Sequence, residues 1–140
     1  MDMARYRAVF LEEAAEHLEE MSRGLLDLER DPARAEAIDL VFRMAHSIKG
    51  MAASLGYEAI AELSHRLEDR MQEARSAGRV DDAGLAALFK GLEGLEAMVG
   101  TVRDGGEAPP WDPALGEALA APRAPDRAAA GPGKKAQRPR

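Results

Sequence analysis

The chain has 140 residues and a net charge of −6, and this length fits one domain with a buried core. It has no cysteine, which excludes disulfides and thiolate metal sites. No long apolar run follows its charged N-terminus, which argues against a signal peptide or membrane insertion and favours a cytoplasmic protein. Aromatic residues make up only 4%, whereas strong helix formers such as Ala, Leu and Glu are abundant, and we therefore expect an all-α fold.

Apolar residues spaced three and four apart predict two long helices in the first part of the chain. The first runs from about 3 to 30 and ends at Asp31-Pro32, because the residue before a proline is pushed out of the α region. The second runs from about 34 to 55, and Gly56 supplies its left-handed stop. The two apolar stripes are Leu11, Ala14, Leu18, Met21, Leu25 and Leu28, and Ile38, Val41, Ala45, Ile48, Ala52 and Leu55.

Two more long helices follow with the same spacing. One runs from about 57 to 77 and ends at Gly78, and the next begins near Asp81 or Asp82, either of which is a good N-cap. Their stripes are Ile60, Leu63, Leu67, Met71 and Ala74, and Leu85, Leu88, Leu92, Leu95, Val99 and Val102. Because short connections make neighbouring helices antiparallel, we predict an up-down-up-down four-helix bundle.

Four glycines interrupt the apolar pattern of the fourth helix: Gly84, Gly91, Gly94 and Gly100. Each costs roughly 1 kcal/mol relative to alanine in a helix interior. Either these glycines allow close packing, or this helix is the least stable of the four.

A short fifth helix is predicted after Pro109-Pro110. Asp112 is its expected N-cap and Pro113 its first residue, and Trp111, the single tryptophan, is expected to dock the segment onto the bundle. The predicted organisation is a bundle over 1–106, a short helix packed on it over 107–121, and a disordered linker over 122–140.

The charge is divided unevenly between the predicted bundle and the tail. After residue 121 the chain has six bases and one acid, a net charge of +5, which leaves −11 on residues 1–121. An acidic body argues against nucleic acid as its partner. The Pro, Gly, Ala and Arg composition of the tail favours disorder, and we interpret it as a linker toward further parts of a longer protein.

His46 is the candidate nucleophile of this chain. Only three histidines and no cysteine are available to act as nucleophiles near neutral pH. His46 lies at the edge of the second apolar stripe, and Lys49 and Gly50 share its face of the helix. The missing side chain of Gly50 leaves the surface low, so that a partner's active site can approach. This setting suits an imidazole that accepts a phosphoryl group and passes it to another protein.

The third helix contributes His65 and Glu68, which are three residues apart and share one face. If the second and third helices pack antiparallel through Gly56, Glu68 can reach His46. A carboxylate that accepts from Nδ1–H fixes the imidazole tautomer and leaves Nε2 as the free, more basic nitrogen. The Lys49 ammonium would then counter phosphate charge, and His65 would hold Glu68 from its other side.

Two other classes of protein remain open from the residues alone. A histidine at a helix edge is usually an ordinary surface residue, so the chain can also be a helical interaction module whose His46 is never phosphorylated. The sequence Glu62-Leu63-Ser64-His65 also matches the Glu-x-x-His pattern of di-metal bundles, although such bundles need two copies and further glutamates.

Three segments together resemble a known family: 46–52 (HSIKGMA), 55–57 (LGY) and 63–68 (LSHRLE), with 6–14 (YRAVFLEEA) similar to its first helix. They resemble the histidine phosphotransfer (Hpt) domain of CheA-like chemotaxis histidine kinases, over about residues 3–103. The resemblance implies that His46 is the phosphorylated histidine, that Lys49, His65 and Glu68 form its hydrogen-bond network, and that the tail leads toward a response-regulator-docking domain.

The resemblance also implies the partners of the chain. A separate kinase catalytic domain would transfer the γ-phosphoryl group of ATP to His46, and an aspartate of a response-regulator receiver domain would take it. The sequence has no Gly-rich nucleotide loop, so we expect this domain to be a phosphoacceptor and carrier without a cofactor of its own. ATP and Mg²⁺ would be bound by the partner domains.

Overall fold

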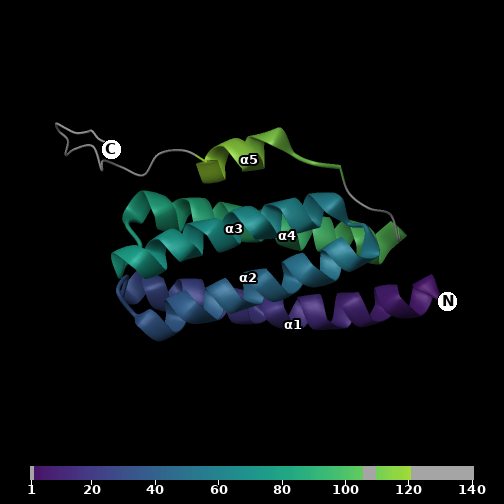
Figure 1. The fold of residues 1–140 in the computed structure, drawn as a ribbon, viewed down its shortest axis with the longest axis horizontal. Coiled ribbons are helices and arrows are strands. Elements are labelled where there is room, and N and C mark those ends of the chain that lie inside the picture. Colours follow the sequence, from purple (N-terminus) through teal and green to yellow (C-terminus); the bar gives the residue numbers. More distant parts are fainter. Residues whose placement is uncertain (1, 106–109, 121–140) are drawn as a thin grey trace.

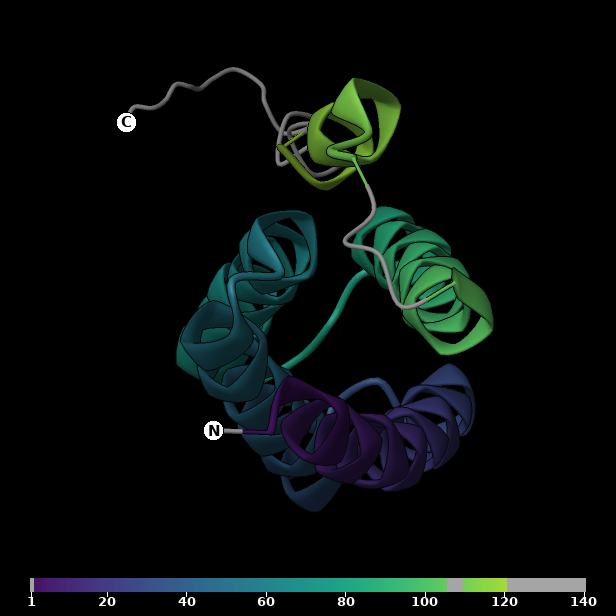
Figure 2. The same cartoon turned by 90° about the vertical axis from the view of Figure 1, so that its right-hand side faces the viewer.

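The computed structural model describes residues 2–105 and 110–120, and this part of the chain is helical without strands. The helices are α1 (Met3–Arg30), α2 (Ala35–Leu55), α3 (Glu58–Ala77), α4 (Asp82–Gly105) and α5 (Pro113–Ala120). The four long helices form an antiparallel bundle, and α5 lies outside it against α3 and α4 (Figures 1 and 2). The predicted all-α four-helix bundle with a short fifth helix is therefore confirmed. The linker predicted over 122–140 lies outside the described residues.

The helices of this described part do not combine the length and apolar character needed to cross a bilayer. Instead, each long helix turns one apolar stripe into a shared core. The predicted stripes are buried except at three end positions, where Leu11, Leu55 and Leu85 are only partly covered. In α1, Phe10 takes the place expected for Leu11, because its ring packs against Tyr57 with 5.2 Å between ring centroids.

Gly56 makes the tight connection between α2 and α3. Its φ of 80° lies in the left-handed region, and its N–H bonds to carbonyls at the end of α2. The next amide, that of Tyr57, bonds to the carbonyl of Ala52 at 2.9 Å, so the last turn of α2 is closed by two backbone donors. This connection sets α2 and α3 side by side in opposite directions, which is the arrangement expected from the sequence.

Two of the four glycines that interrupt the apolar pattern predicted for the fourth helix allow close packing in α4. A methyl group on Gly91 would lie 2.6 Å from Cδ2 of Leu67, and one on Gly94 would lie 2.5 Å from Cδ1 of Leu115 in α5. Gly100 has no such neighbour, since the nearest atom to its Cβ position is an Arg103 nitrogen at 3.7 Å. Close packing therefore accounts for the middle of α4, where α3 and α5 both approach it.

Trp111 and Leu119 hold α5 to the bundle. The Arg66 guanidinium of α3 lies over the Trp111 ring, 5.1 Å from its centroid, within the range of a cation–π contact. Leu119 is buried, with 4% of its surface exposed. The predicted docking of this segment is seen in these contacts.

The conformation of Gly56 leads to a prediction about stability. Gly56→Ala should lower the free energy of unfolding by about 1–2 kcal/mol, because an L-residue is strained in the left-handed region. Gly50→Ala is the matched control: its added methyl group also meets no atom within 4 Å, but Gly50 is helical, so stability should rise by roughly 0.5–1 kcal/mol. Urea denaturation measures both, and stabilisation by Gly56→Ala would contradict the described turn.

Candidate functional site

Three side chains meet where the middle of α2 faces α3. His46 and Lys49 lie one turn apart on α2, and Glu68 projects toward them from α3. Glu68 Oε2 lies 2.6 Å from Nδ1 of His46, and its Oε1 accepts from Nζ of Lys49 at 2.5 Å. The contact between Glu68 and His46 that we inferred from antiparallel packing is present, and each oxygen of the carboxylate has a partner.

Glu68 is buried, although its side chain is ionisable. Only 11% of the side chain is exposed. Burial by itself would raise the pKa of this carboxyl, but hydrogen bonds from Lys49 and His46, together with their charges, outweigh it and hold the pKa below its ordinary value. The carboxylate is therefore ionised at neutral pH.

The ionised carboxylate decides which nitrogen of His46 carries the hydrogen. A carboxylate without a proton can only accept, so Nδ1 must be the donor in the 2.6 Å contact. In the neutral imidazole, Nε2 is then left with its lone pair. The His46 side chain is 62% exposed, and Nε2 lies on the side of the ring away from Nδ1. The neutral ring thus presents the lone pair of Nε2 to a partner.

The surface beside His46 is low, as expected for partner access. Gly50 is exposed, and no atom lies within 4 Å of the position its Cβ would take. Ala53 and Ala61 continue this surface toward a shallow hollow, which Lys49 and His65 also line. A partner's active site can therefore approach His46 over small residues.

His65 is not part of the hydrogen-bonded set, contrary to our expectation. Its Nε2 lies 3.6 Å from Oδ1 of Asp69, one turn further along α3, and both oxygens of Glu68 are taken by His46 and Lys49. The reason is rotational: Glu68 faces α2, whereas half of the His65 side chain is exposed to solvent. The third histidine, His17, lies on α1.

Glu62 and His65, which form the Glu-x-x-His pattern, have no further metal-ligating side chains grouped with them in the described part of the chain. Glu62 accepts from Nε of Arg66 at 2.9 Å, and His65 pairs with Asp69. No group of three His, Asp or Glu side chains is placed to hold a metal ion within residues 2–105 and 110–120.

Phe42, which adjoins His46, was not singled out from the sequence. Neither were Arg75 and Asp39, which are linked to Phe42. The Phe42 ring lies nearly parallel to the imidazole, 10° apart in plane, with 6.4 Å between ring centroids. Arg75 of α3 lies over Phe42 and pairs with Asp39 of α2. Hydrogen bonds from Arg75 and then Arg43 hold the pKa of the Asp39 carboxyl below its ordinary value. The spacing of Phe42, four residues before His46, was the available signal, because it places both on one helix face.

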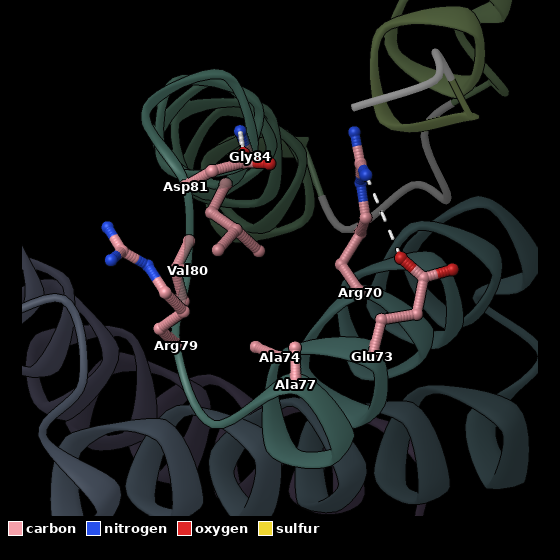
Figure 3. A pocket seen from close by; sticks show the side chains of 9 residues that line it. Arg70, Glu73, Ala74, Ala77, Arg79, Val80, Asp81 and Gly84 are labelled. Carbon is pink, nitrogen blue, oxygen red and sulfur yellow. Dashed lines mark hydrogen bonds and ion pairs between the residues drawn. The ribbon is translucent and has the colours of Figure 1, made fainter. Parts of the chain in front are cut away.

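A separate hollow of about 300 Å³ lies between the end of α3 and the start of α4 (Figure 3). Its charged lining residues are of both signs: Arg70 and Arg79 against Glu73 and Asp81. His46, Lys49 and Glu68 are not among its lining residues. This hollow is therefore not part of the His46 site.

The chain is similar to a known domain family and to known proteins. The family model for the Hpt domain matches residues 5–105. The chemotaxis protein CheA of Bacillus subtilis (strain 168) is 41% identical over 108 residues, which is 76% of this chain but only 16% of that relative. The chain thus spans only a small part of the length of this relative.

Solved structures show the same bundle. The CheA phosphotransferase domain from Thermotoga maritima is 33% identical, with a TM-score of 0.68 over 74% of this chain and 98% of that domain. The phosphorylated P1 domain of CheA3, solved in complex with CheY6 from R. sphaeroides, has a TM-score of 0.76 over 82% of this chain and 92% of that one. The latter is 24% identical, so it shows similarity of fold alone.

The lowered pKa of Glu68 predicts how the site responds to pH. Because the folded-state pKa lies below its ordinary value of 4.5, the unfolded chain binds more protons in that range, and the contribution of Glu68 to stability is lost as pH falls. The difference in unfolding free energy between the wild type and Glu68→Gln should therefore be largest above pH 4.5 and shrink on acidification, measured by urea denaturation.

The background Lys49→Met provides the control for this pH series. It removes one of the groups that lower the pKa of Glu68, so the pH dependence of the Glu68→Gln effect should become weaker. A difference between the wild type and Glu68→Gln that stays the same from neutral to acid pH would contradict the described ion pair.

Proposed function

The chain belongs to the family of Hpt domains, and on this basis we propose that His46 carries a phosphoryl group from ATP to a response regulator. A separate kinase catalytic domain donates the group, and an aspartate of a receiver domain accepts it. The observation that supports this most strongly is the His46 imidazole itself, whose Nδ1 is held by a buried carboxylate while the rest of the ring is exposed.

The first transfer requires an imidazole nitrogen with a free lone pair. Nε2 of His46 attacks the γ-phosphorus of ATP, the bond from that phosphorus to the bridging oxygen breaks, and ADP leaves with the electron pair. The ring becomes a phosphoimidazolium whose proton stays on Nδ1. Glu68 stabilises that positive charge through its hydrogen bond, and the nearby Lys49 ammonium counters the charge of the phosphoryl oxygens.

The second transfer breaks the bond between phosphorus and Nε2. A carboxylate oxygen of the receiver's aspartate attacks phosphorus, the P–N bond breaks, and its electrons return to Nε2, which restores the neutral ring. The P1 domain of CheA3, which has the same fold, was solved phosphorylated and in complex with CheY6. That complex supports a receiver partner for this chain, and the low surface at Gly50 suits its approach.

We assign ATP and Mg²⁺ binding to the partner domains. This chain covers only 16% of the Bacillus subtilis relative, and the rest of that relative is long enough to hold a catalytic domain. For the present domain, the catalytic domain can belong to the same polypeptide or to a partner chain. The present domain then acts in the cytoplasm, where ATP is available, as substrate and carrier of the phosphoryl group.

The central residue is tested by substitution. His46→Gln should fold normally, because the side chain is mostly exposed, and should accept no phosphoryl group from a CheA-like kinase catalytic domain with γ-labelled ATP. The measurement is acid-labile, base-stable label on the purified domain, followed by its loss on addition of a receiver domain.

His65→Gln and His17→Gln are the matched controls, and both should still accept label. Label retained in His46→Gln would overturn the assignment and point to one of these two histidines. A wild-type domain that folds but never accepts label would favour the unphosphorylated interaction module.

A further inference from the structure

Phe42 stands beside the reacting ring without a role in the steps above. It lies one turn before His46 on α2, partly buried, and the two rings are nearly parallel, with planes 10° apart. Their centroid separation of 6.4 Å lies within the range of interacting aromatic pairs. The imidazole therefore has a parallel, offset aromatic ring one turn before it on the same helix.

Phe42 is itself held from the neighbouring helix. The Arg75 guanidinium carbon of α3 lies 4.0 Å from the Phe42 ring centroid, well inside the range of a cation–π contact. Arg75 is anchored by Asp39 of α2, which also accepts from Nε of Arg43 at 2.8 Å. The ring of Phe42, which comes from α2, is thus covered by an arginine from α3.

The hydrogen bond to Glu68 leaves one freedom of the His46 ring unrestrained. The orientation of the ring depends on two torsions, χ1 and χ2, whereas the single contact at Nδ1 constrains mainly one distance. Coupled changes of the two torsions can therefore still turn the ring plane while that hydrogen bond is kept. Such tilting moves the Nε2 lone pair, which lies in the ring plane, away from an incoming phosphorus. Displacement at phosphorus requires the attacking and leaving atoms to be roughly in line, so a tilted ring reacts slowly even when its tautomer is correct.

We propose that Phe42, held by Arg75, is a positioning residue that fixes the plane of the His46 ring for phosphoryl transfer. This inference rests on the proposed function of His46. Glu68 sets which nitrogen is free, and the Phe42–Arg75 pair sets the direction in which its lone pair points. Neither Phe42 nor Arg75 exchanges a proton or binds the phosphoryl group in this role.

The pair can be altered without loss of the fold. The Arg75 side chain is 40% exposed, and exposed ion pairs contribute little to stability. Phe42→Leu keeps an apolar side chain but removes the flat ring, whereas Phe42→Tyr keeps the ring. Arg75→Gln removes the guanidinium above Phe42. Arg43→Gln is the matched control, because it removes the same charge and a bond to the same aspartate but has no stacking contact with Phe42.

The experiment measures phosphorylation by a separate kinase catalytic domain at increasing concentrations of each variant. Phe42→Leu and Arg75→Gln should lower the maximal rate roughly threefold to tenfold, the size expected for loss of an aromatic contact, with KM for the domain unchanged. Phe42→Tyr and Arg43→Gln should react like the wild type. By proton NMR, the ring-current shift of the His46 ring protons should disappear in Phe42→Leu and persist in Phe42→Tyr.

Several results would overturn the inference. Equal maximal rates for the wild type, Phe42→Leu and Arg75→Gln would remove the positioning role while the proposed function of His46 stands. A raised KM with an unchanged maximal rate would make Phe42 a docking contact. An equal loss of rate in Arg43→Gln would show that the loss of a positive surface charge, and not the contact with Phe42, causes the lower rate. A wild-type domain that accepts no label would overturn the proposed function, and this inference with it.

Discussion

The carboxylate of Glu68 is the group on which the site depends. A buried charge without partners is costly, and both oxygens of this one are paired, with Nδ1 of His46 and Nζ of Lys49. The two partners come from α2, and the carboxylate comes from α3, so the pairing exists only while these helices keep their register. The same contact that makes the buried acid tolerable also places the hydrogen of the neutral His46 ring on Nδ1, so that Nε2 keeps its lone pair. The contact between Glu68 and His46 therefore both stabilises the buried carboxylate and sets the tautomer of the imidazole.

The rest of the fold keeps α2 and α3 in that register. The left-handed Gly56 reverses the chain between them, and the buried stripes of α1 and α4 cover their inner faces. Close packing of α4 at Gly91 and Gly94 brings α3 and α5 against it, on the side of α3 that does not contact His46. The described contacts of the site come from α2 and α3 alone, which leaves the His46 face of the bundle open to a partner.

Much of this could be predicted from the sequence because it depends on periodicity. Apolar spacing placed the four long helices, and the antiparallel turn at Gly56 was enough to bring Glu68 to His46. The contact expected between His65 and Glu68 is not present, because spacing alone assigns a helix face too coarsely: the two residues are three apart, yet His65 is half exposed to solvent and Glu68 turns to α2. The spacing of Phe42 before His46 was a signal within one helix, but the contact of Arg75 with Phe42 could not be predicted, because it depends on side-chain conformations on two helices.

The central claim is that Glu68 fixes the tautomer of His46 and leaves Nε2 as the nucleophile. The ¹⁵N shifts of the His46 ring in the unphosphorylated domain, recorded where the imidazole is neutral, measure this directly. We predict a hydrogen on Nδ1 and none on Nε2. A ring that carries its hydrogen on Nε2 would contradict this claim, because the nitrogen that faces the partner would then have no lone pair with which to take the phosphoryl group.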